Sequence, residues 1–299
     1  MAIPNLFLRI LRNPISRILL GSIAISAPIA GIQVLLRGYG EPTGLSEFDW
    51  FKLLSNGSAI LGEFIGYIIY VRLVEWRWPT EISPRGFLLE FGKGLGLGAL
   101  LFTSTMLLLW LYGYFEIDAF NSLAVTTTAL GVSLSGFFEE LLVRGVIYRI
   151  MEESLGTWIA LVLSAVLFGL MHMANPNATL GAGIALALEA GLLLAAAYTL
   201  THRLWFATGL HFAWNYTQGG IFGLPISGND MTGMIQGKVT GPDWISGGAF
   251  GVEASVIAVA VCLAATAVIM RKVVKRGLIT EPFWKRKTFV GADGNPPAV

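Results

Sequence analysis

The charged segment Gly136–Gly145, GFFEELLVRG, lies at the end of a long apolar run. Glu140 and Arg144 are four residues apart, so on an α-helix they lie on one face and can form an ion pair. Glu139 is rotated by about 100° from Glu140 and need not share that partner. Charged groups inside an apolar segment are costly and mark a candidate functional site. The segment therefore predicts either a water-activating glutamate supported by an ion pair, or a structural ion-pair cluster at a helix end.

Two of the three histidines place further polar groups in apolar segments. Phe168 and His172 are four residues apart in FGLMH, and His211 and Asn215 are four apart in HFAWN, so each pair shares a helix face. A carboxylate, two imidazoles and a carboxamide can supply a base for water, a proton carrier and oxyanion donors. Taken singly, each histidine is better explained as a helix-contact residue. Together with the glutamates, these groups favour a hydrolytic site, whereas His202 in a cationic loop is expected to be interfacial.

The composition is typical of an integral membrane protein. The 299 residues are 55% hydrophobic and 13% charged, and the mean hydropathy is +0.68. An average soluble domain carries about 25% charged residues. The net charge of +1 gives no indication of a nucleic acid partner. The single cysteine, Cys262, excludes an internal disulfide, a Cys-rich metal site and a dithiol redox motif.

Eight apolar windows have the length of roughly 20 residues that spans a bilayer as a helix. They lie at about 17–36, 53–72, 90–113, 122–147, 157–173, 178–200, 204–222 and 250–270. Loops rich in Lys and Arg alternate with loops poor in them, and the positive-inside bias then places both termini in the cytoplasm. The sequence predicts an all-α, multi-pass membrane protein with about eight transmembrane helices. We expect one membrane domain over 1–276, with its core at about 122–222, and a polar tail over 277–299.

The three motifs together resemble a known family. EELLVR fits EExxxR, FGLMH fits FxxxH and HFAWN fits HxxxN, in this order along the chain. These are the motifs of the CPBP intramembrane proteases, which include the type II CAAX prenyl endopeptidases and bacteriocin-processing or self-immunity proteins. Each motif alone is weak, but three in order on successive apolar segments are specific. The resemblance covers about residues 131–216, and no motif position departs from the pattern.

The resemblance implies a role for each matched residue. Glu139 would activate the hydrolytic water, and His172 would help to orient it. His211 and Asn215 would stabilise the tetrahedral oxyanion. The residues with supporting roles would be Glu140, Arg144 and Phe168. The resemblance also implies a cavity open to the cytoplasmic side, in which an isoprenyl chain could lie beside the scissile bond.

The expected activity is hydrolysis of a peptide bond near the membrane by a glutamate-activated water. The substrate would be a prenylated CAAX-type peptide or another membrane-associated peptide, and the lipid bilayer would be the other partner. The sequence leaves open the natural substrate, the oligomeric state and the role of the Gly-rich loop 223–248. It is also compatible with either a bacterial inner membrane or a eukaryotic endomembrane.

Metal use is left open by the residues. Glu139, His172 and His211 could hold a Zn²⁺ with an open position for water, and the family is traditionally labelled metalloprotease. The same residues could act without metal, with Glu139 polarising water directly. The pairing of His211 with Asn215 on one face favours the metal-free alternative, because it resembles an oxyanion pair rather than a ligand pair.

The sequence is also compatible with functions other than proteolysis. The charged residues in or near the spans that could line a transport path are Glu63, Glu90, Lys93, Glu189 and Glu253, although Glu90, Lys93 and Glu253 are expected to snorkel or pair locally. The chain could also be an immunity factor or scaffold that retains the motif residues. A transporter should depend on Glu63 or Glu189, whereas a protease should depend on the motif residues. HExxH, GxSG and GxGD motifs, typical of other membrane proteases, are missing from the expected spans.

The sequence also leaves open how His172 reaches the same depth in the membrane as Glu139 and His211. Simple counting places His172 near the outer end of its span, whereas Glu139 and His211 lie several residues from the cytoplasmic ends of theirs. A long interfacial stretch over 148–156, a late start to the next span, or non-helical backbone at 175–177 would bring His172 to the same depth.

Overall fold

The apolar segments form helices in the computed structural model, which describes residues 11–37 and 50–286. The α-helices are α2 (Pro14–Arg37), α3 (Trp50–Leu73), α4 (Phe87–Leu111), α5 (Thr127–Glu140), α6 (Arg149–Leu155), α7 (Thr157–Met171), α8 (Leu180–Leu186), α9 (Leu192–Thr201), α10 (Leu204–Asn215), α11 (Asp243–Ser246) and α12 (Val256–Lys275). Stretches of π-helix continue α5, α8 and α10, namely η3 (Leu141–Tyr148), η5 (Ala187–Gly191) and η6 (Tyr216–Ile221). Short 3₁₀ turns are η1 (Thr80–Ile82), η2 (Leu123–Thr126), η4 (His172–Ala174), η7 (Gly248–Phe250) and η8 (Val252–Ala254).

Five helical segments of the described chain are long and apolar enough to cross a membrane. They are Pro14–Ile32, Phe87–Leu111, Thr157–Ala174, Leu180–Thr201 and Val256–Lys275. The other three expected spans are helical too, as α3, as α5–η3–α6 and as α10–η6, but they carry many of the polar and charged side chains. The count of eight spans stays a prediction, and the last span begins at Val256 rather than near residue 250.

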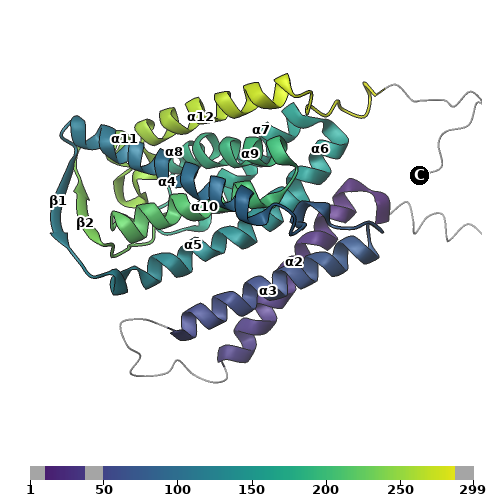
Figure 1. Cartoon of the computed structure of the whole chain (residues 1–299), viewed down its shortest axis with the longest axis horizontal. Coiled ribbons are helices and arrows are strands. Elements are labelled where there is room, and N and C mark those ends of the chain that lie inside the picture. Colours follow the sequence, from purple (N-terminus) through teal and green to yellow (C-terminus); the bar gives the residue numbers. More distant parts are fainter. Residues whose placement is uncertain (1–10, 38–49, 287–299) are drawn as a thin grey trace, which may run out of the picture.

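The all-α prediction was incomplete, because a two-stranded antiparallel sheet lies at one end of the helix bundle (Figure 1). Its strands are β1 (Phe115–Phe120) and β2 (Ile235–Val239), with Phe115 opposite Val239 and Phe120 opposite Ile235. A β-bulge lies between Ile117 and Ala119. The pairing joins segments more than 100 residues apart, so local sequence patterns could not reveal it. Part of the Gly-rich loop 223–248 thus has a structural role as β2.

Helix α10 lies in the middle of the bundle, where it packs against α4, α5 and α9 (Figure 1). Its contact with α4 depends on glycine. A Cβ added at Gly209 would lie 2.4 Å from the Phe91 carbonyl oxygen, and one added at Gly94 would lie 2.4 Å from the Phe206 oxygen. Small residues let helix backbones approach closely within a membrane. This close packing fixes the position of α10, which carries His211 and Asn215.

The helical segment that carries Glu139 continues past the expected end at residue 147. After α5, the segment runs through η3 and α6 to Leu155, and Gly156 (φ +80°) turns the chain into α7. Glu139 precedes this turn by nearly as many residues as His172 follows it. Because α7 runs back antiparallel, the two residues reach the same level. Residues 148–156 therefore bring His172 to the depth of Glu139, because they form the helix α6 and the turn at Gly156.

Both ends of the described chain contact α6, at the end of the bundle opposite the sheet (Figure 1). Arg17 of α2 forms an ion pair with Glu153, and the Arg286 guanidinium donates to the Glu153 carbonyl. The Phe283 amide donates to the Ser154 carbonyl. Residues 277–286 of the expected polar tail therefore pack on the helical bundle, and the remainder, 287–299, lies outside the described residues.

A buried carboxylate, Glu75, ties the α2–α3 hairpin to α6 at this end. Its oxygens accept hydrogen bonds from Arg17 at 2.8 Å, Arg77 at 2.8 Å and Arg149 at 2.8 Å, and from the Tyr70 hydroxyl at 2.9 Å. Burial alone would raise the pKa of Glu75, but Arg149, Arg17 and Arg77 outweigh it and lower the pKa to about 2.

We expect this cluster to make stability depend on acid pH. The lowered pKa of Glu75 gives a stabilisation that is present above the unfolded value of 4.5 and is lost as pH falls from there towards 2. Glu75→Gln should cost on the order of 3 kcal/mol at pH 7, and much less near pH 3. Thermal unfolding of detergent-purified protein between pH 3 and 7 measures this difference. The control is Glu116→Gln, at an exposed position on β1, and an equal effect of Glu75→Gln at both pH values would contradict the prediction.

Candidate active site

The predicted ion pair of the first motif forms where α5 continues into η3. Arg144 Nη1 lies 2.9 Å from Glu140 Oε1, and both side chains are 0% exposed. The Arg144 guanidinium also donates to the Gly191 carbonyl at 3.2 Å and lies over the Phe168 ring, with Cζ 4.7 Å from its centroid. The pair thus joins η3 to α7 and η5. A buried guanidinium with these partners holds the Glu140 carboxylate in one place.

Glu139 points away from this pair, as expected from its position on the helix. Its side chain is 18% exposed, and its Oε1 accepts a hydrogen bond from Ser135 Oγ at 3.1 Å. Its Oε2 is buried and has no hydrogen-bond partner in the described part of the chain. A carboxylate oxygen in this state is available to accept a proton or a hydrogen bond from a molecule that enters the site.

His172 faces Glu139 from the end of α7. Its Nδ1 lies 2.8 Å from the Phe168 carbonyl oxygen, which can only accept, so we assign a proton to Nδ1. The other ring nitrogen, Nε2, lies 3.7 Å from Glu139 Oε2. The Phe168 ring packs against the His172 ring in a tilted arrangement, with centroids 4.6 Å apart. In neutral His172, Nε2 therefore presents a lone pair to the space in front of Glu139.

His211 faces the same space from α10. Its Nδ1 lies 2.9 Å from Glu140 Oε1, which places a proton on Nδ1, and its Nε2 lies 3.9 Å from Glu139 Oε2. Gly136 permits this arrangement, because a Cβ there would lie 3.3 Å from the His211 ring. Thus Glu140 accepts from both Arg144 and His211, and it fixes the tautomer of the histidine.

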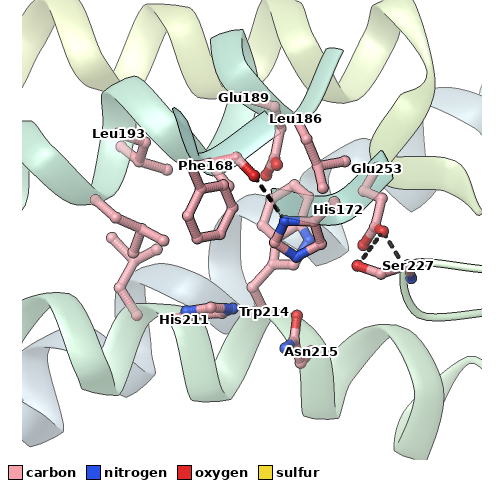
Figure 2. Close-up of a pocket in the computed structure, with 13 residues that line it drawn as sticks. Phe168, His172, Leu186, Glu189, Leu193, His211, Trp214, Asn215, Ser227 and Glu253 are labelled. Atoms are coloured by element: carbon pink, nitrogen blue, oxygen red, sulfur yellow. Dashed lines mark hydrogen bonds between the residues drawn. The ribbon is translucent and has the colours of Figure 1, made fainter. Parts of the chain in front are cut away.

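Asn215 lies one turn further along α10 and is 7% exposed. Figure 2 shows its carboxamide pointing into the pocket that His172 and His211 line. Within the described residues, no group hydrogen-bonds this carboxamide. Its two N–H donors are therefore free to bind an acceptor that enters the pocket.

The structure brings together all four residues expected to be catalytic, and it separates His202 from them. His202 ends α9 with a left-handed backbone (φ +49°), and its Nε2 lies 3.4 Å from Glu152 Oε2. The distances of 3.7 and 3.9 Å from Glu139 Oε2 to the two Nε2 atoms are too long for direct hydrogen bonds. Polar atoms at such a separation are suited to share a water molecule.

The residues do not fit a metal centre in this geometry. No group of three or more His, Cys, Asp or Glu residues within 11–37 and 50–286 is arranged to hold a metal ion. Ligand atoms at about 2.0–2.2 Å from a tetrahedral Zn²⁺ would be roughly 3.4 Å apart, closer than Glu139 Oε2 is to either Nε2 atom. The metalloprotease interpretation is therefore not supported.

The pocket into which Asn215 points is small and is lined by two further carboxylates among mostly apolar side chains (Figure 2). Glu189 of η5 and Glu253 of η8 line it together with His172, His211 and Asn215, and the cavity measures about 20 Å³. This volume has room for about one water molecule, which the carboxylates, imidazoles and carboxamide of the lining could hold. Glu189, a candidate for a transport path by its sequence position, lies beside the motif histidines in the structure.

A chain of hydrogen bonds that the sequence does not predict runs from Glu253 through Ser227 and Asn175 to the backbone of His172. Glu253 Oε1 accepts hydrogen bonds from the backbone amide and the hydroxyl of Ser227, at 2.7 and 2.8 Å. The Ser227 carbonyl accepts from Asn175 Nδ2 at 3.2 Å, and the Asn175 amide donates to the His172 carbonyl at 3.1 Å. Asn175 follows His172 closely, but no local pattern links either to Ser227 or Glu253.

The comparison with family models gives one match for this region. Residues 120–217 match the model described as type II CAAX prenyl endopeptidase Rce1-like, and the match contains the four residues around the site. The comparison with curated proteins gave no match, and neither did the comparison with solved structures. A helical bundle of this hydropathy with such a domain is an integral membrane protein of a protease family. More specifically, residues 120–217 are similar to the CAAX-type branch of the CPBP intramembrane proteases, and the three motifs lie within this match.

Proposed function

We propose that the chain is an intramembrane endopeptidase that hydrolyses a peptide bond with a water activated by Glu139. The observation that carries this proposal is the unpaired Oε2 of Glu139, which faces the Nε2 atoms of His172 and His211. A water in this space would donate to Glu139 and to one histidine lone pair. Its oxygen would then be oriented for attack on a carbonyl carbon.

The proposed reaction moves one proton around the site. Glu139 takes it from the attacking water as the C–O bond forms, and it passes to His211 Nε2. The resulting imidazolium is stabilised by Glu140 at Nδ1, in the way that a carboxylate stabilises histidine in a catalytic triad. Asn215 and the new Nε2–H donate to the oxyanion. When the C–N bond breaks, His211 returns the proton to the leaving amine.

The substrate would be a prenylated CAAX-type peptide or another peptide at the membrane. The end of the bundle that carries Arg17, Arg77 and Arg149 would face the cytoplasm, in accordance with the positive-inside bias. Both described chain ends lie at this end, and both termini would then be cytoplasmic. The apolar helices around the site would allow a lipidated or apolar segment to reach it from the bilayer.

The test is cleavage of a quenched fluorescent farnesylated CAAX peptide by detergent-purified protein. Because protein groups supply the base, the proton carrier and the oxyanion donors, we expect a strong chelator to leave kcat within about twofold of its untreated value. Loss of activity on chelation, restored by Zn²⁺, would contradict this metal-free mechanism. No cleavage of this peptide or of an unprenylated membrane peptide by the wild-type protein would contradict the proposed activity.

A further inference from the structure

A second, larger cavity lies between α2, α3 and α5, on the Ser135 side of the catalytic carboxylate. Its volume is about 450 Å³. Its walls are largely apolar, with Ile29 from α2, Ile60 from α3 and Phe138 from α5. Ser135, which donates a hydrogen bond to Glu139, also lines this cavity. The cavity is therefore connected to the site through one side chain.

Glu63 of α3 lines this cavity at the level of Glu139. Two contacts set the register: Asn56 Nδ2 donates to the Gly131 carbonyl at 3.3 Å, and the Tyr67 hydroxyl donates to the Gly145 carbonyl at 3.1 Å. Helix α3 thus runs parallel to α5 and η3 with a nearly constant offset. Glu63, between these two contacts, comes to the depth of Glu139 on the neighbouring helix.

The Glu63 carboxylate has no partner for its buried oxygen. The residue is 3% exposed, and its Oε2 makes no hydrogen bond to any residue that the structure describes. An unsatisfied carboxylate in an apolar setting is costly and marks a functional group by default. A carboxylate only accepts hydrogen bonds, so the complementary ligand group is a donor. A hydrocarbon chain alone has none.

We infer that Glu63 binds the peptide backbone of the substrate, accepting a hydrogen bond from an amide N–H of an extended, apolar segment in this cavity. Each residue of such a segment has an N–H that needs an acceptor away from water. The cavity supplies apolar contacts for the side chains and Glu63 supplies the acceptor. The bound backbone then lies beside Glu139, next to the attacking water. The assignment rests on the proposed function, since it names a substrate contact of that site.

The first test separates binding from turnover. In a Glu139→Gln background, a fluorescent farnesylated CAAX peptide is titrated and its anisotropy gives Kd. Adding Glu63→Leu should raise Kd about tenfold, the effect of losing one hydrogen bond to a charged group. Glu63→Gln retains an acceptor oxygen and should recover most of the affinity. With Glu139 present, Glu63→Leu should raise KM while kcat stays within about threefold.

The sharper test removes the donor instead. Versions of the peptide with one amide N-methylated at a time are bound to both proteins. One position should lose about tenfold in affinity when Glu63 is present and almost nothing when it is leucine. Glu116→Gln, on the exposed face of β1, is the matched control and should behave as wild type.

Several results would overturn the assignment. They are an absence of peptide binding to the Glu139→Gln protein, equal losses at every N-methylated position in both proteins, or a fall in kcat with unchanged KM. Displacement of the peptide by phosphatidylcholine only when Glu63 is present would assign the cavity to a lipid headgroup instead. Because Kd needs no turnover, the two failures are distinguishable: Glu63-dependent peptide binding without cleavage would contradict the proposed activity, whereas cleavage with a Kd that does not depend on Glu63 would contradict the Glu63 contact alone.

Discussion

Glu139→Gln should reduce kcat for cleavage of the farnesylated peptide by about 10²–10⁴-fold, the usual contribution of a general base. The amide keeps the size of the carboxylate and can still accept the hydrogen bond from Ser135. It cannot accept the proton of the attacking water. Since binding of the peptide does not use this proton, KM should change little. Steady-state kinetics of the purified proteins measure both quantities.

The matched control is Glu153→Gln, at a carboxylate that forms ion pairs with Arg17 and Arg149 far from the site. It is at the cytoplasmic end of α6 in the proposed orientation and should retain nearly full kcat. Unimpaired turnover by Glu139→Gln would refute the water-activating role. It would assign the activation of water in this peptidase to a group other than Glu139.

The similarity to the family and the helix faces that carry the four candidate site residues could be predicted because they depend on local spacing. Residues four apart on a helix share a face, and the pairs Glu140–Arg144 and Phe168–His172 follow this rule in the structure. The match over residues 120–217 supports the family interpretation. That Glu139, His172, His211 and Asn215 lie close together could not be predicted from helix geometry. It was expected because polar groups in separate apolar segments are costly unless they contact one another.

The rest could not be predicted because it depends on long-range contacts. The β1–β2 sheet and the hydrogen bonds from Ser227 to Glu253 join segments that carry no shared local pattern. The length of the α5–η3–α6 segment was also underestimated. Polar residues such as Arg149 and Glu152 near its end suggested an interface, whereas buried ion pairs and hydrogen bonds satisfy them within the fold.

Arg144→Met, which breaks the buried Glu140–Arg144 ion pair, should have the second large effect, on both stability and activity. Arg144→Met keeps an unbranched apolar side chain in the space of the arginine but leaves the Glu140 carboxylate, 0% exposed, without its cation. Breaking a buried pair in this way costs about 3–5 kcal/mol, because an uncompensated charge stays buried. The cation–π contact with Phe168 is lost as well. We expect a large loss of thermal stability in detergent, measured by circular dichroism, and a loss of activity.

A second variant separates the effect of the ion pair on protein stability from its effect on the position and protonation of His211. Glu140→Gln combined with Arg144→Met removes both charges, and it should recover much of the stability, because exchanging a whole buried pair for neutral groups is often nearly neutral. His211 would still lack the carboxylate that holds its Nδ1 proton and stabilises its imidazolium. Its kcat should therefore stay at least about tenfold below wild type even where the protein is fully folded. If the double variant regains wild-type kcat, the pair has only a structural role, and the proton carrier at His211 does not need Glu140.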